Sequence, residues 1–196
     1  MYFISDTHFF HTNIIKLTGR PFDDYNQMNY TMIKNWNKTV SPNDIVYHLG
    51  DFAYGLWKIE DAERKLTELF HSLNGVKHLI VGNHDPDMTL SLPWAEVSYY
   101  KELMYNKKRI VLSHYPILEW HDCFKGSLHL HGHTHQESPL EVMNRDVELM
   151  KTAQHHFPYN PNVVSSRFSN FHKNWRNICV EKINYTPQHI DDLIKE

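Results

Sequence analysis

The sequence contains little cysteine, since Cys123 and Cys179 are the two in 196 residues. They lie far apart and in no CxxC pattern, which excludes a disulfide framework and a cysteine-based zinc site. A chain of this kind suits a reducing compartment, and we predict that it is cytoplasmic.

Long apolar runs are also absent. No stretch reaches the roughly 18 apolar residues that a membrane-spanning helix needs, and the opening residues MYFISDTH lack the basic region of a secretory signal. We therefore expect a soluble protein that is not exported by a cleavable signal.

An excess of positive charge is lacking as well. The formal net charge is −3 at pH 7, so the chain has no broad basic field of the kind that dominates affinity for long nucleic acids. Extended nucleic-acid binding is not expected, whereas small nucleotides and nucleic-acid ends stay compatible with this charge.

What the chain does contain is an alternation of strands and helices. Short β-rich segments lie at 1–5, 44–49, 77–81, 109–112, 126–131 and 177–183. Helical spacing of apolar residues marks 26–40, 55–75 and 187–196. This order predicts an α/β fold with helices outside the sheet.

The length of 196 residues suits one domain with a real core. Trp36, Trp57 and Phe70 lie in the predicted helices and are assigned to that core. The polar stretch 137–174 fits the alternation least well, and we expect it to form a helix-and-loop excursion beside the sheet.

Polar side chains with metal-binding chemistry follow five of the predicted strands. They are Asp6, His8, Asp51, Asn83, His84, Asp85, His114, His133 and His135. In α/β sheets, ligands bind outside the carboxyl ends of strands, so these residues can converge in one crevice. Imidazole, carboxylate and amide ligands together suit Mn, Fe, Zn or Ni better than Ca or Mg.

The spacing of these residues also points to shared ions. In extended chain, alternate residues point the same way, so Asp6 with His8, and His133 with His135, can each hold one ion. Asp51 is the candidate bridge between two ions, because a carboxylate offers two oxygens.

The ordered blocks D-x-H, G-D, G-N-H-D, a lone His and G-H-x-H resemble the motifs of the calcineurin-like metallophosphoesterases. All five occur between residues 6 and 135, and GRPF (19–22) and NICVEKINYTP (177–187) add a weaker likeness to small single-domain members from bacteria and their phages. The resemblance implies a two-sheet β-sandwich flanked by helices, a two-metal centre, and hydrolysis of phosphomonoesters or phosphodiesters.

Carried over to this chain, the resemblance implies two ligand sets with Asp51 between them. The first set is Asp6, His8 and His135, and the second is Asn83, His114 and His133. Manganese is the favoured metal, with iron, zinc or nickel as alternatives. His84 is not expected to bind metal in this family and would face the substrate.

Two ions about 3.5–4 Å apart can hold a bridging water, lower its pKa and present hydroxide in line with phosphorus. They also neutralise charge on the phosphoryl oxygens. The leaving oxygen still needs a proton, which we assign to His84 as general acid. Asp85 either orients that imidazole or is a carboxylate of the turn.

Three residues after the first ligand pair are candidates for substrate binding. These are His11, Asn13 and Arg20. Arg20 either offers a planar fork to a phosphate or is a solvated loop arginine.

Most other histidines are interpreted as ordinary surface or core residues. This group is His48, His71, His78, His129, His155, His156, His172 and His189. His131 belongs with them, with support of the metal site as the alternative.

The leading hypothesis is a metal-dependent phosphoesterase, with a phosphodiester or nucleotide substrate slightly favoured over a monoester. A catalytically silent interaction module would have lost ligands, and none is missing. The H-x-H-x-D-H block of metallo-β-lactamase-like enzymes and the H-x-E…P-C-x-x-C signature of deaminases are both absent.

Overall fold

The computed structural model describes residues 1–136 and 174–195. Apart from Asn174, the excursion expected at 137–174 lies outside the described residues. In chain order the described elements are β1 (Tyr2–Ile4), α1 (Thr12–Leu17), α2 (Tyr25–Thr39), β2 (Ile45–His48), η1 (Leu56–Lys58), α3 (Ala62–Ser72), β3 (Val76–Ile80), α4 (Asp87–Leu90), β4 (Glu96–Ser98), β5 (Tyr100–Tyr105), β6 (Lys108–Ser113), η2 (Cys123–Lys125), β7 (Leu128–His131), β8 (Trp175–Asn177), β9 (Gln188–His189) and α7 (Ile190–Lys195).

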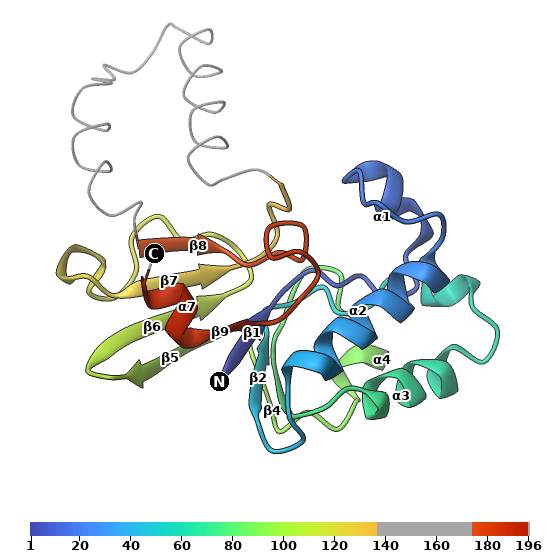
Figure 1. Cartoon of the computed structure of the whole chain (residues 1–196), viewed down its shortest axis with the longest axis horizontal. Coiled ribbons are helices and arrows are strands. Elements are labelled where there is room, and N and C mark those ends of the chain that lie inside the picture. Colours follow the sequence, from blue (N-terminus) through green and yellow to red (C-terminus); the bar gives the residue numbers. More distant parts are fainter. Residues whose placement is uncertain (137–173, 196) are drawn as a thin grey trace, which may run out of the picture.

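The strands form two sheets. The first has the order β4-β3-β2-β1-β9, with β1 to β4 parallel and β9 antiparallel at its edge. The second has the order β5-β6-β7-β8, in which the β5–β6 pair is antiparallel. Figure 1 shows α2 and α3 on the side of the first sheet that faces away from the second. The predicted architecture of two sheets flanked by helices is therefore confirmed.

The first sheet is buried on both faces, as β1 illustrates. Successive side chains of a strand point to opposite faces, so Phe3 packs between the two sheets while Ile4 packs under the helices. Phe3 is 0% exposed and Ile4 is 1% exposed. Strands buried in this way explain the near-continuous apolar runs of the sequence.

Helix α2 shows how the local sequence fixes an element over this sheet. The Asp24 side chain accepts a hydrogen bond from the Gln27 backbone N–H, which caps the first turn. Met28, Met32 and Trp36 then recur every four residues and are buried. The predicted helix at 26–40 is confirmed within one residue at each end.

Three predicted segments differ from the structure. The helix expected at 55–75 is divided into η1 and α3, and the helix expected at 187–196 is α7, preceded by β9. The strand expected at 177–183 gives way to turns after Asn177. Strands β4 and β5 were not predicted, because their half-exposed faces carry mixed polar and apolar residues.

The division of the second helix changes one core assignment. Trp36 and Phe70 are buried as predicted, but Trp57 is 69% exposed. It lies on η1, which follows Gly55 in a left-handed conformation (φ 78°), so its side chain leaves the apolar face of α3. The core assignment of Trp57 is therefore wrong.

His129 and His131 continue β7, as the strand interpretation requires. His129 is fully buried against Trp120. Its Nδ1 donates to Val111 O (3.2 Å), and its Nε2 accepts from Ile117 N (3.0 Å), a pattern that only the neutral ring satisfies. Burial lowers the pKa of His129 to about 4, although the bond to Val111 opposes this.

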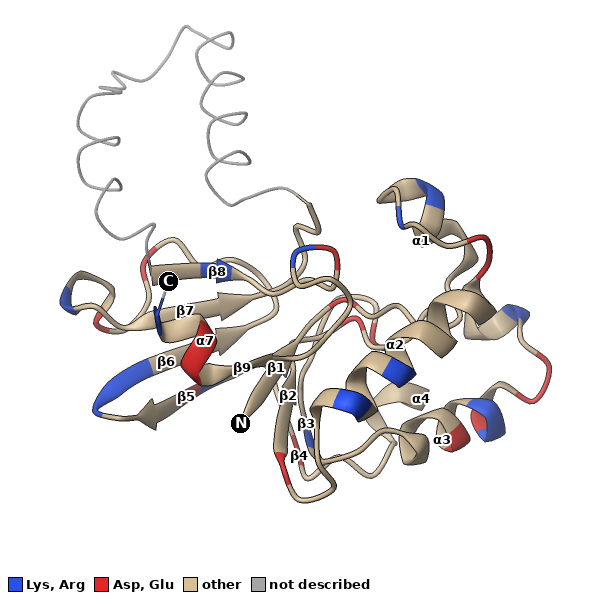
Figure 2. Cartoon of the chain, viewed as in Figure 1, with Lys and Arg blue, Asp and Glu red and all other residues tan. Residues whose placement is uncertain are grey.

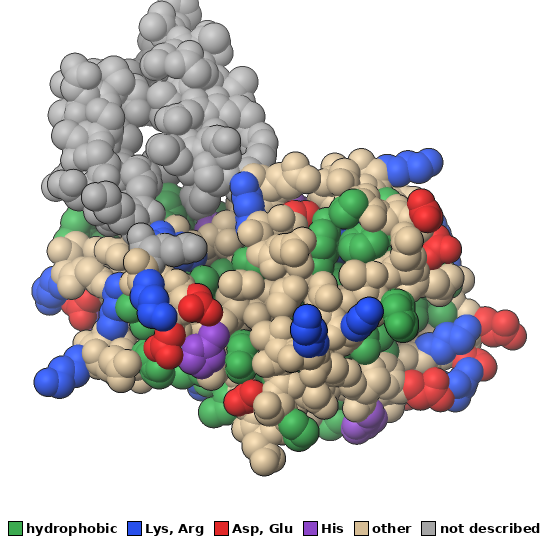
Figure 3. All heavy atoms as spheres, viewed as in Figure 1, with side chains coloured by type: hydrophobic (Ala, Val, Ile, Leu, Met, Phe, Trp, Pro, Cys, Tyr) green, Lys and Arg blue, Asp and Glu red, His purple; other side chains and the backbone are tan. Residues whose placement is uncertain are grey.

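Charged side chains are intermixed on the surface. Figure 2 shows basic and acidic residues on the same helix α3, and Figure 3 shows blue and red side chains side by side on one face. Among the described residues, this face presents no continuous basic patch. Within the same residues, no helix is long and apolar enough to cross a membrane.

The His129 bonds predict a pH dependence of stability. The folded-state pKa of about 4 is below the ordinary 6.5. The contribution of neutral His129 to the free energy of unfolding is therefore complete above pH 6.5 and is lost as the pH falls toward 4. Between pH 6.5 and 5 the loss should be about 1–2 kcal/mol. Urea unfolding of metal-free wild type and His129→Gln should show a shallower pH slope in the variant. The exposed His71→Gln is the control, and equal slopes for wild type and His129→Gln would contradict this role.

Candidate metal centre

The predicted ligands meet where strands of both sheets end. Asp6 and His8 follow β1, Asp51 follows β2, and Asn83 follows β3, whereas His114 follows β6 and His133 and His135 follow β7. Asp6, His8, Asp51 and His114 are each at most 2% exposed. His133 and His135 are half-buried and Asn83 is exposed, so the structure gathers residues far apart in the sequence into one cluster with a buried base.

One group of acceptor atoms surrounds Asp6. Its Oδ1 lies 3.9 Å from His8 Nε2 and 3.8 Å from His135 Nε2, and His8 Nε2 lies 3.5 Å from Asp51 Oδ2. Asp6 Oδ1 and His8 Nε2 are buried, and neither has a hydrogen-bond partner among the described residues. Ligand atoms of Asp6, His8 and Asp51 lie within 4.8 Å of one another. These residues fit a metal ion, because buried polar atoms need a partner.

A second group lies on the other side of Asp51. His114 Nδ1 donates to Leu49 O (2.8 Å), so in a neutral ring Nε2 carries a lone pair. That lone pair faces Asn83 Oδ1 at 3.0 Å and Asp51 Oδ2 at 3.7 Å. The His133 ring lies 5.2 Å from the His114 ring, centroid to centroid. Acceptors that face one another at these distances also fit a cation between them.

Asp51 connects the two groups through a single oxygen. Oδ2 faces both His8 and His114, while Oδ1 accepts a hydrogen bond from the His84 backbone N–H (2.8 Å). Its contact with both groups is therefore made by Oδ2, while Oδ1 is engaged by the backbone. Burial raises the pKa of Asp51, and repulsion from Asp6 adds to this.

At five of the seven proposed ligands the backbone is left-handed rather than extended. Positive φ angles occur at Asp6 (57°), His8 (49°), Asp51 (57°), His133 (68°) and His135 (49°). Alternation along a strand is therefore the wrong reason for the D-x-H and H-x-H spacing. Residues other than glycine adopt this backbone conformation at a cost of about 1–3 kcal/mol each, and such residues cluster at functional sites.

The second carboxylate oxygen of Asp6 is held by three donors. Oδ2 accepts from Ser5 Oγ, from the His133 backbone N–H (3.0 Å) and from Cys179 Sγ (3.2 Å). A Cβ on Gly132 would lie 2.0 Å from Ser5 Oγ, so only glycine lets the chain after β7 approach this closely. These contacts turn Oδ1 toward the two histidines.

Asp85 joins two loops of the site. Its carboxylate accepts hydrogen bonds from the backbone N–H groups of Asp51 (2.9 Å), Phe52 (2.8 Å) and Gly82 (2.8 Å). These contacts favour the turn-carboxylate interpretation over orientation of the His84 ring.

Arg20 is not available to a substrate. Its guanidinium is buried and donates to Asp6 O (2.7 Å), Thr7 O (2.8 Å) and Glu181 Oε1 (2.9 Å). Both interpretations of Arg20, as a phosphate-binding side chain and as a solvated loop residue, are therefore wrong. Its hydrogen bonds instead hold the backbone of the first ligand pair.

The other two candidate substrate residues lie near the centre. His11 Nδ1 is 3.3 Å from His8 Nδ1, and Asn13 is exposed on α1. Both line a cavity of about 290 Å³ together with Tyr54 and Trp57.

Glu181 is a site residue that the sequence analysis did not identify. Its Oε1 accepts from His135 Nδ1 (3.1 Å) as well as from Arg20. Burial alone would raise the pKa of Glu181, but the His135 hydrogen bond and the Arg20 charge outweigh it and lower the pKa to about 2. A carboxylate on Nδ1 fixes the ring so that Nε2 faces the centre.

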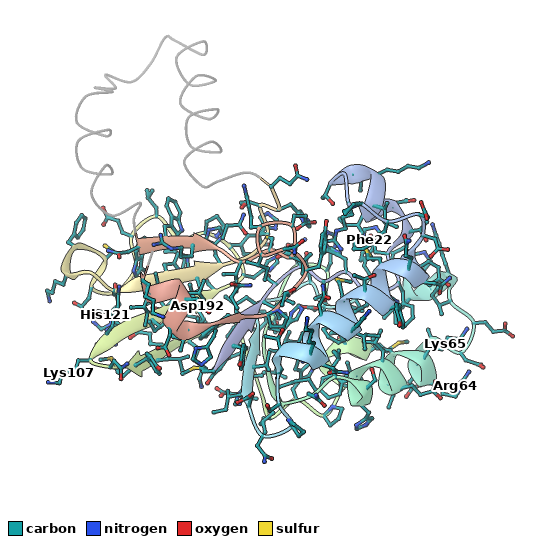
Figure 4. The ribbon with its side chains drawn as sticks, viewed as in Figure 1. Phe22, Arg64, Lys65, Lys107, His121 and Asp192 are labelled. Carbon is teal, nitrogen blue, oxygen red and sulfur yellow. The ribbon has the colours of Figure 1, made fainter. Side chains whose placement is uncertain are left out.

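This contact predicts weaker metal binding in Glu181→Gln. Loss of such a carboxylate lowers metal affinity by about 10–100-fold, and titration against a competing chelator would measure it. Glu102→Gln is the matched control, since Glu102 pairs with His121. Figure 4 shows His121 and Lys107 at the end of the molecule away from Arg64 of α3. Equal affinities in both variants would refute the role of Glu181.

Two sheets whose strand ends gather two groups of nitrogen and oxygen acceptors define an α/β sandwich protein with a metal-binding centre. The chain belongs to the calcineurin-like phosphoesterase family, whose sequence pattern matches residues 1–190. It is therefore a metal-dependent phosphoesterase, a hydrolase.

Known relatives cover most of the chain. Uncharacterized protein MJ1445 of Methanocaldococcus jannaschii is 35% identical, over 100% of this chain and 89% of that protein. The Gene 66 protein of Mycobacterium phage L5 is 25% identical over 74% of this chain and 81% of its own length. The crystal structure of AQ665 from Aquifex aeolicus, a protein of unknown function, is 29% identical and covers 100% of this chain and 97% of that one, with a TM-score of 0.62.

Proposed function

We propose that the centre holds two metal ions and hydrolyses a phosphodiester or nucleotide substrate. The first ion would be bound by Asp6, His8 and His135, and the second by Asn83, His114 and His133, with Asp51 between them. The observation that carries the proposal is the position of Asp51 Oδ2, 3.5 Å from His8 Nε2 and 3.7 Å from His114 Nε2.

The donor set favours manganese, with iron, zinc or nickel as alternatives, because imidazole and carboxylate ligands are mixed. When bound, the two ions would activate a water molecule and neutralise the charge that develops on the phosphoryl oxygens. The chain's own residues orient the ligands and supply the remaining proton.

Two observations support His84 as the donor of that proton. Its backbone N–H is tied to Asp51 Oδ1, and its ring lies 5.8 Å from the His8 ring, centroid to centroid. The side chain is exposed, so it can reach a leaving oxygen at the mouth of the centre. A general acid in this position contributes about 10²–10⁴ in rate.

The buried free thiols of Cys123 and Cys179 support the inference of a reducing compartment, and we propose the cytoplasm.

The first experiment compares an aryl phosphodiester with the matching monoester. Metal-stripped protein should be inactive and should regain diester turnover with Mn²⁺, and Asp51→Asn should stay at background because its amide removes a charge from between the ions. Asp192→Asn is the control, because Asp192 is an exposed residue of α7, labelled in Figure 4. Monoester preference would make the protein a phosphatase, and no turnover with two metals bound would indicate a silent module.

The general-acid role predicts a dependence on the leaving group. His84→Ala should keep both metals and lose about 10²–10⁴ in rate on esters with poor leaving groups, but much less on activated aryl esters. Rates with both substrate types and metal content should be compared with His71→Ala, an exposed histidine of α3. Equal losses on both substrate types would argue against proton donation by His84.

A further inference from the structure

A cavity of about 560 Å³ opens beside the candidate centre. Asn83 and His84 line it at the side of the centre, and its other walls include Tyr54, Trp57, Ile59 and Met88. This volume lies within the roughly 300–1,000 Å³ typical of small-molecule sites. The cavity is thus large enough for an organic group attached to a phosphate at the centre.

Aromatic rings connect the centre to this cavity without a break. The His8 ring lies 5.8 Å from the His84 ring, which lies 4.7 Å from the Tyr54 ring, which in turn lies 4.9 Å from Trp57. The cavity therefore begins at the side chain proposed to protonate the leaving oxygen. A group that departs from phosphorus on the His84 side would lie in it.

Apart from His84, which carries a proton in its proposed role, the walls offer no free charge to a ligand. Asp85 is the one other charged residue among the described residues that line the cavity. Its carboxylate already accepts hydrogen bonds from three backbone N–H groups, those of Asp51, Phe52 and Gly82. A neutral group with apolar faces suits this lining better than a charged one.

Trp57 is the feature that the fold itself does not require. It is 69% exposed at the edge of the cavity, whereas the core tryptophan Trp36 is fully buried. A large exposed aromatic side chain beside a catalytic centre is a stacking platform for a planar ring.

We propose that this cavity binds the leaving group of the substrate and that this group is a nucleoside, with its base stacked on Trp57. The proposal rests on the phosphoesterase function above. A water oxygen forms a bond to phosphorus while the bond from phosphorus to the nucleoside oxygen breaks. The electron pair of that bond stays on the nucleoside oxygen, which takes a proton from His84, and the attacking water releases a proton to solvent.

The test uses two phosphodiesters that differ only in the leaving group. One is a thymidine dinucleotide, and the other carries an abasic deoxyribose in place of the leaving thymidine. Wild type should prefer the first by about tenfold in kcat/KM, the scale of one base stacked on an aromatic side chain. Trp57→Ala should lose this preference, Trp57→Phe should retain part of it, and Tyr99→Ala, which removes a 75% exposed ring outside the cavity, should keep it.

Equal kcat/KM for the two diesters in wild type, or a preference that survives Trp57→Ala, would overturn the proposal. Thermal unfolding of each variant checks that the exposed substitutions leave the fold intact. Tighter binding of O-phosphotyrosine than of thymidine 5′-monophosphate would assign the cavity to phosphorylated tyrosine and would likewise overturn it.

A binding measurement separates this proposal from the phosphoesterase function. Equilibrium dialysis of Mn²⁺-loaded protein should show about tenfold tighter binding of thymidine 5′-monophosphate than of deoxyribose 5-phosphate, with the difference lost in Trp57→Ala. Equal binding overturns the nucleoside site even if an aryl diester is hydrolysed. Failure to hydrolyse any ester, with the difference in binding present, overturns the function and leaves the nucleoside site supported.

Discussion

Crowding of polar atoms around Asp51 Oδ2 is the constraint on which the rest of this structure depends. Asp51 Oδ2 has a histidine nitrogen on each side, and Asn83 Oδ1 faces His114 Nε2 at 3.0 Å. Acceptors removed from water without a donor are costly. A divalent cation bound between them would convert each of these contacts into coordination, so this arrangement of side chains fits a metal site.

The surrounding residues hold the acceptors in place from behind. His114 and His135 each use Nδ1 on a fixed acceptor, Leu49 O and Glu181 Oε1, which turns Nε2 to the centre. Close approach of the backbone likewise holds the carboxylates in a fixed orientation. A Cβ on Gly82 would lie 2.3 Å from Asp51 Oδ1, which explains why a glycine precedes Asn83 in this motif. Orientation of the ligands, more than their number, distinguishes this cluster from ordinary buried polar groups.

The two-sheet fold was predicted from the family resemblance that five ordered motifs carry, and the same motifs named the residues that meet. The motifs did not predict how these residues meet. The left-handed backbone at Asp6 and His135 follows from tertiary contacts that no local spacing reveals. Glu181 was assigned to a strand, and the turn after Asn177 brings it to His135 instead. Trp57 was assigned to the core by helical spacing, which the left-handed Gly55 interrupts. Each difference arises where a turn overrides a periodic pattern.

Both proposed ligand sets draw on both sheets. Asp6 and Asn83 follow strands of the first sheet, while His135 and His114 follow strands of the second. An ion held by either set would act as a cross-link between the halves of the sandwich. By mass action, an ion bound only to the folded chain stabilises it by about 2.7 kcal/mol at a free concentration one hundred times its Kd. The supply of metal would then govern how long the protein survives proteolysis in the cell, in addition to its catalytic rate.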